Sequence, residues 1–327
     1  MAREPRNGAT LRNLDFVAPP AHAHPARRQS LERISVAPLR IWAASAGKWR
    51  LYWRPMRIAV PLIALLMAGA APGQQTGFRW PDGAKAAVAL TYDDGVDVQL
   101  DHAVPDLEAA RLRGTFYVTG YSESFRKRMA EWRAIAARGH ELGNHTLFHP
   151  CLKQADGRER TWVDAERDLN TYSIARIAAE FRVMDAFLHA VDGEKAHTLA
   201  YTCGDETIRG VSFVDSIRPL APAARAYKHA FRALADPLEL DPYRVPSWAL
   251  ANDKGAEMIA WVEQAVQSGA LAVFTFHGVG GGHSINVDRE DHQALLRWLD
   301  ANRARVWTAP FVKIMAHVTA ERRRLAR

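Results

Sequence analysis

The sequence predicts an α/β fold in which parallel strands alternate with helices. Short apolar runs, typical of strands buried on both faces, occur at residues 86–90, 115–119 and 271–276. Stretches of helical character follow or separate these runs, at residues 103–113, 125–138, 162–188, 254–268 and 289–302. Alternation of this kind is typical of βα units, whose reactive side chains gather on loops beyond the carboxyl ends of the strands.

Chemically active residues follow the first and third of these runs. The first is rich in alanine, with Val88 and Leu90, and leads into Asp93-Asp94-Gly95. The second is β-branched and aromatic and is closed by Gly120. The third runs directly into His277-Gly278. Two more clusters, at residues 143–150 and 201–205, complete the set of candidate site segments.

These clusters contain what a hydrolytic metal centre needs. A divalent metal takes about three protein ligands and keeps one position open for water or substrate. An unligated carboxylate must accept a proton from the water, and an acid must protonate the leaving group. Alone, the Asp-Asp-Gly segment would be a turn and His277 a histidine at the end of a strand. Together with the His145/His149 pair they predict a metal-dependent hydrolase.

Over residues 78–318 the chain resembles the polysaccharide deacetylase family of carbohydrate esterases, the group with the NodB-homology domain. Its first motif, Thr-Phe-Asp-Asp-Gly, is similar to residues 91–95, with Tyr92 in place of phenylalanine. Its second, His-Ser/Thr-x-x-His-Pro, matches residues 145–150, and its last, an apolar strand ending in histidine, matches His277. The resemblance implies a deformed (β/α) barrel of seven or eight strands and a catalytic domain over residues 78–320.

The resemblance also implies roles for individual residues. Asp93 would be the general base and His277 the general acid. Asp94, His145 and His149 would hold one divalent metal ion, most simply Zn²⁺. The substrate would be a polysaccharide or oligosaccharide that carries N-acetyl or O-acetyl groups.

The third motif of the family departs from the pattern. It usually reads Arg-Pro-Pro-Tyr-Gly, and its arginine pairs with the base, whereas this chain has Ala-Tyr-Thr-Cys-Gly at residues 200–204. Either another cation, such as Arg244, takes that role, or Asp93 is oriented differently. A backbone N–H near Cys203 would stabilise the oxyanion, a function that does not depend on the side chain.

Other side chains are candidates for contacts with the substrate. Trp248 would offer a stacking face for a sugar or lie in the core. His283, after three glycines, would face the substrate or lie in a mobile loop, and the acidic pair Asp205-Glu206 would bind hydroxyl groups or be solvated. The two cysteines, Cys151 and Cys203, would form a disulfide in an oxidising compartment or remain free thiols.

Alternative functions on the same fold are another C–N or acetyl-ester hydrolase and a catalytically silent glycan-binding module. The intact candidate residues at positions 93, 94, 145, 149 and 277 argue against the silent module, and the missing arginine argues for it. The sequence leaves the oligomeric state open.

The basic charge of the chain is confined to its N-terminal part. Residues 1–57 hold 11 Lys and Arg against 3 Asp and Glu, which leaves 32 basic and 33 acidic residues for the rest. The catalytic region is therefore near neutral, and the charge gives no indication of nucleic-acid binding.

Residues 56–71 predict a signal peptide. Met56-Arg57 precedes an apolar run over residues 58–67, which is followed by small residues. The run is shorter than the roughly 20 residues of a membrane span, so we expect export to the periplasm or medium and no stable membrane anchor. Residues 1–55, rich in Arg, Ala and Pro, would then be either untranslated or disordered.

Overall fold

The computed structural model describes residues 77–226 and 232–327. The expected extension at residues 1–55 and the expected signal peptide at residues 56–71 lie outside these residues. Across the described part of the chain, no helix is both long and apolar enough to cross a bilayer.

An eight-stranded sheet forms the centre of the fold, and all of its pairings are parallel. Its order is β10-β11-β1-β2-β3-β6-β9, and β14 pairs with the beginning of β1. The strands are β1 (Ala86–Asp94), β2 (Thr115–Val118), β3 (Glu141–Asn144), β6 (Leu199–Ala200), β9 (Ala224–Arg225), β10 (Trp248–Ala249), β11 (Leu271–Phe276) and β14 (Val306–Thr308). The expected α/β barrel of seven or eight parallel strands is confirmed.

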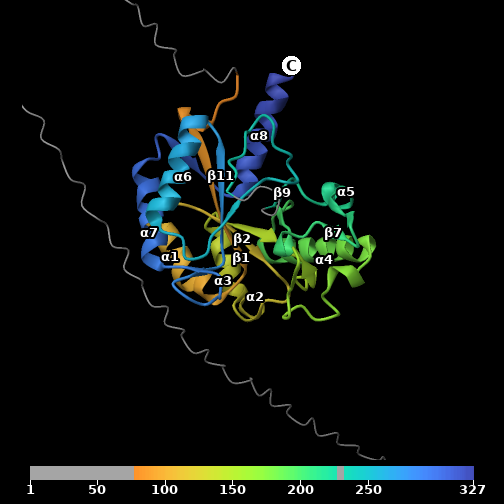
Figure 1. The fold of residues 1–327 in the computed structure, drawn as a ribbon. Coiled ribbons are helices and arrows are strands. Elements are labelled where there is room, and N and C mark those ends of the chain that lie inside the picture. The colour runs from red at the N-terminus through yellow and green to blue at the C-terminus, as the bar shows by residue number, and fades with distance from the viewer. Residues whose placement is uncertain (1–76, 227–231) are drawn as a thin grey trace, which may run out of the picture. The chain divides into compact units, whose positions relative to one another are not determined.

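Helices surround the sheet, and in the view of Figure 1 α1, α6 and α7 lie at the left and α4 at the right. All four contribute side chains to one apolar cluster. The helices are α1 (Val104–Ala109), α2 (Glu123–Lys127), α3 (Met129–Ala137), α4 (Ile174–Asp192), α5 (Val214–Ile217), α6 (Gly255–Ser268), α7 (Arg289–Ala301) and α8 (Phe311–Leu325). Three short two-stranded pairs lie in loops: β4–β5 (Gln154–Ala155, Arg158–Glu159), β7–β8 (Thr207–Ile208, Val211–Ser212) and β12–β13 (Gly278–Val279, Asn286–Val287).

Side chains that alternate along β1 pack into two separate apolar clusters, one on each face of the strand. Val88 and Leu90 pack in the apolar cluster that includes α6 and α7. Ala87 and Ala89 face the other cluster, which includes Tyr117 and side chains of α8. Because side chains alternate along a strand, Asp93 lies on the same face as the two alanines. The small alanines leave room on that face for the polar groups that follow them.

The helix expected at residues 162–188 begins later than predicted. Residues 151–173 instead form the β4–β5 hairpin and a series of turns. Asp205 holds this segment by accepting hydrogen bonds from the Leu152 N–H (2.8 Å) and the Arg160 guanidinium (2.5 Å). Helix α4 begins only after Ser173, whose Oγ caps the N–H of Arg176. Similarly, the helix expected at residues 125–138 is interrupted at Arg128, between α2 and α3.

A buried histidine joins the end of α4 to the beginning of β6. Nδ1 of His197 lies 2.7 Å from Asp185, and Nε2 lies 3.2 Å from both carboxylate oxygens of Asp192. Burial lowers the pKa of His197, but the carboxylates of Asp192 and Asp185 together raise it by more than burial lowers it. The net shift of the pKa is therefore upward. The folded state therefore favours the protonated imidazole.

This contact predicts that stability falls as the pH rises. The pKa of His197 is higher in the folded chain than the ordinary value of about 6.5, so its contribution is complete below about pH 6.5 and is lost as the pH rises through the folded pKa. In urea unfolding, His197→Gln should cost about 1.5 to 3 kcal/mol at pH 6 and clearly less at pH 9. His189→Gln, on the exposed face of the same helix, is the control. A loss for His197→Gln that does not change with pH would contradict this account.

Candidate metal centre

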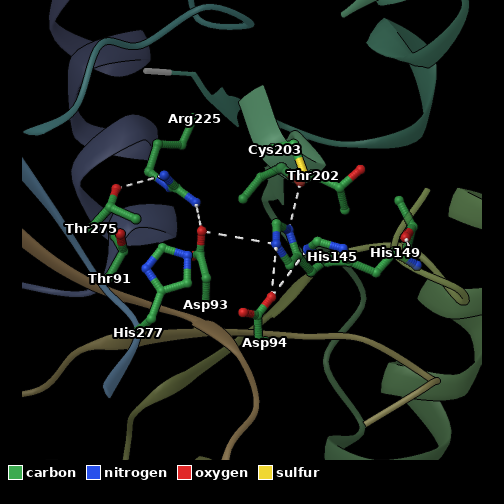
Figure 2. A network of polar contacts seen from close by, with 12 residues as sticks. Thr91, Asp93, Asp94, His145, His149, Thr202, Cys203, Arg225, Thr275 and His277 are labelled. Atoms are coloured by element: carbon green, nitrogen blue, oxygen red, sulfur yellow. Dashed lines mark hydrogen bonds and ion pairs between the residues drawn. The ribbon is translucent and has the colours of Figure 1, made fainter. Parts of the chain in front are cut away.

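The carboxyl ends of β1, β2, β3 and β11 meet at one edge of the sheet, and the candidate residues gather there (Figure 2). Asp93 and Asp94 end β1, His145 follows β3, and His277 follows β11. The same end of a (β/α) barrel carries the active sites of barrel enzymes. All five candidate residues line one cleft of about 1050 Å³.

Asp94, His145 and His149 offer ligand atoms that lie within 4.8 Å of one another. Nε2 of His149 lies 3.1 Å and Nε2 of His145 lies 3.6 Å from Oδ1 of Asp94. This Oδ1 is buried and has no hydrogen-bond partner among the described residues. A buried carboxylate oxygen that faces two imidazoles fits a divalent cation, because a cation would satisfy all three groups at once.

His145 is held as a neutral imidazole. Its Nδ1 lies 2.9 Å from the carbonyl oxygen of Ala200, which can only accept, so Nδ1 carries the proton and Nε2 keeps its lone pair. Burial lowers the pKa of His145 to about 4, which keeps the ring neutral at pH 7. For Asp94, burial alone would raise the pKa, but His149 outweighs it and holds the pKa well below its usual range.

The backbone turns sharply at the residues of this site. Asp94, Thr146, His149 and Cys203 all have positive φ values, between 53° and 75°. Such conformations cost about 1 to 3 kcal/mol each in residues other than glycine and tend to cluster at functional sites. At Asp94 the turn has a direct effect on the geometry. It takes this residue out of the strand alternation, so that both adjacent carboxylates reach His145, at 3.6 and 3.8 Å.

Arg225 is the cation beside Asp93, and sequence reasoning missed it. Its Nη2 lies 2.5 Å from Oδ2 of Asp93, and Nη1 donates to Oγ1 of Thr275 at 2.5 Å. Both charged side chains are at most 2% exposed. The alternative suggested by the sequence, Arg244, instead pairs with Glu206 at 2.7 Å. The signal that could have revealed Arg225 is its position among buried alanines, because an arginine in such a run needs a buried partner.

His277 projects into the cleft from the end of β11. Its ring is largely buried, and its Nδ1 has no hydrogen-bond partner among the described residues. Burial lowers the pKa of His277, although the nearby carboxylates of Asp94 and Asp93 oppose this effect. A neutral imidazole near two carboxylates can exchange a proton with a group bound in the cleft.

The two cysteines form a disulfide. Cys151 and Cys203 are joined, with their Cα atoms 5.8 Å apart. The bond connects the segment that follows His149 to the turn at residues 202–204, and Cys203 lines the cleft. The disulfide therefore holds together two segments of the rim that are distant in sequence.

Burial excludes a substrate contact that the sequence left open for two groups. Trp248 is 2% exposed and packs against Trp261 and Phe274, so it has no face for a sugar. The pair Asp205-Glu206 is also buried and is engaged by Arg160 and Arg244, so it does not form a solvated loop or a free hydroxyl-binding pair.

The fold and the cleft define a parallel α/β-barrel protein with an Asp-His-His cluster that could hold a metal ion at the carboxyl ends of its strands. Residues 76–212 match the family model described as polysaccharide deacetylase. This region of the chain is therefore similar to the polysaccharide deacetylase family, as its motifs indicated.

Two curated relatives match short regions. A peptidoglycan-N-acetylglucosamine deacetylase of Bacillus cereus is 38% identical over 76 residues, which are 23% of this chain and 27% of the relative. A chitooligosaccharide deacetylase of Sinorhizobium fredii is 37% identical over 84 residues, 25% of this chain and 38% of the relative. The matches thus span about a quarter to two-fifths of these relatives.

A solved structure from Mycobacterium smegmatis, provisionally described as a polysaccharide deacetylase, shares the fold. It aligns with a TM-score of 0.50 and 18% identity over 75% of this chain and 94% of the other. At this identity the likeness concerns the fold alone.

The buried ion pair predicts a characteristic pattern of unfolding free energies. Arg225→Met should cost about 3 to 5 kcal/mol, because it leaves the Asp93 carboxylate buried and unpaired. The double variant Asp93→Asn/Arg225→Met should lose less than the sum of the two single variants, because both charges are gone. Arg111→Met, which breaks a largely exposed ion pair with Asp300, should stay within about 1 kcal/mol of the parent. Additive losses in urea unfolding of the Asp93/Arg225 variants would contradict the pairing.

Proposed function

We propose that the protein is a metal-dependent hydrolase that removes N-acetyl or O-acetyl groups from a polysaccharide or oligosaccharide. The observation that carries the proposal is the convergence of Asp94, His145 and His149 beside a second carboxylate, Asp93, that is held by its own cation. The family match over residues 76–212 supports the glycan as the class of substrate. The disulfide at the rim of the cleft supports export into an oxidising compartment.

The proposed chemistry divides the residues by role. Asp94, His145 and His149 would hold the ion. A bound divalent ion would supply a Lewis acid for the acyl oxygen and a lower pKa for water. Asp93 is placed to accept a proton, because Arg225 fixes its Oδ2 while its Oδ1 has no hydrogen-bond partner among the described residues. His277 is placed to take up a proton and then deliver it to the departing amine.

The walls of the cleft suit a sugar. Tyr121 and Trp162 both line it and are 56% and 54% exposed. The ring of Trp162 lies 6.2 Å from that of His149, and the Arg167 guanidinium lies over Tyr121 at 4.9 Å. Large aromatic faces beside a polar site are typical of surfaces that bind the apolar face of a sugar ring. Trp162 thus takes the role that the sequence suggested for Trp248.

Release of acetate tests the proposed function. The protein should release acetate from at least one member of a panel of N- and O-acetylated glycans, and a chelator should abolish the release. Asp94→Ala should lose the bound metal. Asp93→Asn should keep the metal while kcat falls by about 10²-fold or more, because the three ligands are intact and the base is missing. No acetate from any glycan would overturn the function, and loss of metal from Asp93→Asn would overturn the division of roles.

The aromatic wall predicts an effect on affinity rather than on chemistry. Trp162→Ala should raise KM for an acetylated oligosaccharide by about 2- to 10-fold, the scale of one aromatic stacking contact. The rate with a small acetyl ester should change less, because that substrate has no sugar ring to stack on Trp162. Trp162→Phe, which keeps an aromatic face, should recover most of the affinity. Equal KM values for the parent and Trp162→Ala would exclude the stacking contact.

A further inference from the structure

The loop after β12 brings a further histidine, His283, to the metal centre. Strands β12 and β13 pair in parallel and close the loop between them. The N–H of Gly278 donates to the carbonyl of Ile285 at 3.0 Å, and that of Gly281 donates to Oδ1 of Asn286 at 2.7 Å. These contacts tie the loop to its own base.

The glycines before His283 fit the loop closely against the neighbouring segment. Gly282 has a φ of 76°, and a Cβ at this position would lie 2.5 Å from Cγ1 of Val98. The backbone therefore approaches Val98 more closely than any side chain at residue 282 would allow. The loop therefore packs against Val98, whereas the sequence had left a mobile loop as one alternative.

His283 contacts two residues of the proposed centre. Its Nε2 lies 3.4 Å from Oδ2 of Asp94. Its ring stacks on that of His277, with centroids 5.0 Å apart and planes inclined by 17°. The side chain is 26% exposed and lines the cleft.

The backbone selects the tautomer of His283. Nδ1 lies 3.0 Å from the N–H of Ile285, which needs an acceptor, and 3.2 Å from the carbonyl of Ile285. That carbonyl already accepts from the N–H of Gly278. Nδ1 therefore accepts from Ile285, and the proton lies on Nε2, the atom that faces the Asp94 carboxylate.

The two oxygens of Asp94 then have different partners. Oδ1 faces His145 and His149, the other proposed ligands, while Oδ2 lies 3.4 Å from Nε2 of His283. A donor to the second oxygen of a ligating carboxylate fixes the direction of the first oxygen, and such contacts are worth about 10- to 100-fold in metal affinity.

We propose that His283 is a positioning residue of the metal centre, which holds Asp94 through Nε2–H and supports the ring of His277 by stacking. The inference rests on the proposed function, because it concerns the same ion. It gives the glycine-rich loop a role that none of the family motifs recognised in the sequence assigns to it.

Zinc affinity tests this inference without relying on activity. The purified full chain is stripped of metal and titrated with zinc against a competing chelator dye. His283→Ala should bind zinc about 10- to 100-fold more weakly than the parent. His283→Gln, which keeps an N–H donor on a flexible side chain, should recover most of the loss. His189→Ala, an exposed histidine on α4, should match the parent.

The outcomes separate the possible roles of His283. Parental affinity in His283→Ala would overturn the inference and leave the proposed function intact. Equal and severe loss in the Ala and Gln variants would show that His283 is itself a ligand, which also overturns a positioning role. If the parent binds no zinc, the metal centre itself is wrong, and the inference falls with it. Circular dichroism of the metal-free variants ensures that only folded proteins are compared.

Discussion

The ion pair between Asp93 and Arg225 is the interaction on which the geometry of the cleft depends. Strand β9, which carries Arg225, lies four strands away from β1 in the sheet. In a flat sheet that separation would be about 19 Å, far beyond the reach of two side chains. The observed contact at 2.5 Å therefore requires the sheet to curl into a barrel and places both charges in its interior. A buried carboxylate is tolerated there because its partner is buried with it.

Two adjacent carboxylates can serve different roles because the chain changes conformation between them. Asp93 still has the conformation of the strand and faces the barrel interior, where it pairs with Arg225. Asp94 has a φ of 75° and turns towards His145 and His149. An ordinary strand would have sent the two side chains to opposite faces. The local strain at Asp94 is thus what allows one dipeptide to supply both a ligand and a free base to the same cleft.

The sequence predicted the parts of the fold whose signals are local. The runs at residues 86–90, 115–119 and 271–276 became β1, β2 and β11 because their burial follows directly from their apolar composition. Two-residue strands such as β6 and β9 carry no such pattern, and only pairing with their neighbours defines them. The start of α4 was misplaced because the preceding segment is held by Asp205 and by a disulfide, both long-range constraints.

The same distinction applies to the site. Asp93, Asp94, His145, His149 and His277 lie in compact motifs, and the structure brings them into one cleft. Arg225 belongs to no motif, and its role depends on the curl of the sheet. Trp162 and His283 lie on loops whose course depends on contacts with Asp205 and Val98. Residues whose role depends on long-range contacts were therefore missed or left open. Residues that lie in short sequence motifs were predicted as site residues.

A crystal structure of the zinc-soaked protein, with anomalous data collected at the zinc edge, tests the central claim most directly. We expect one strong peak between Asp94, His145 and His149, about 2.0 to 2.2 Å from one oxygen of Asp94 and from Nε2 of both histidines. Asp93 should remain paired with Arg225 and outside the coordination sphere. A peak elsewhere in the cleft, or one coordinated by Asp93 in place of Asp94, would contradict the account.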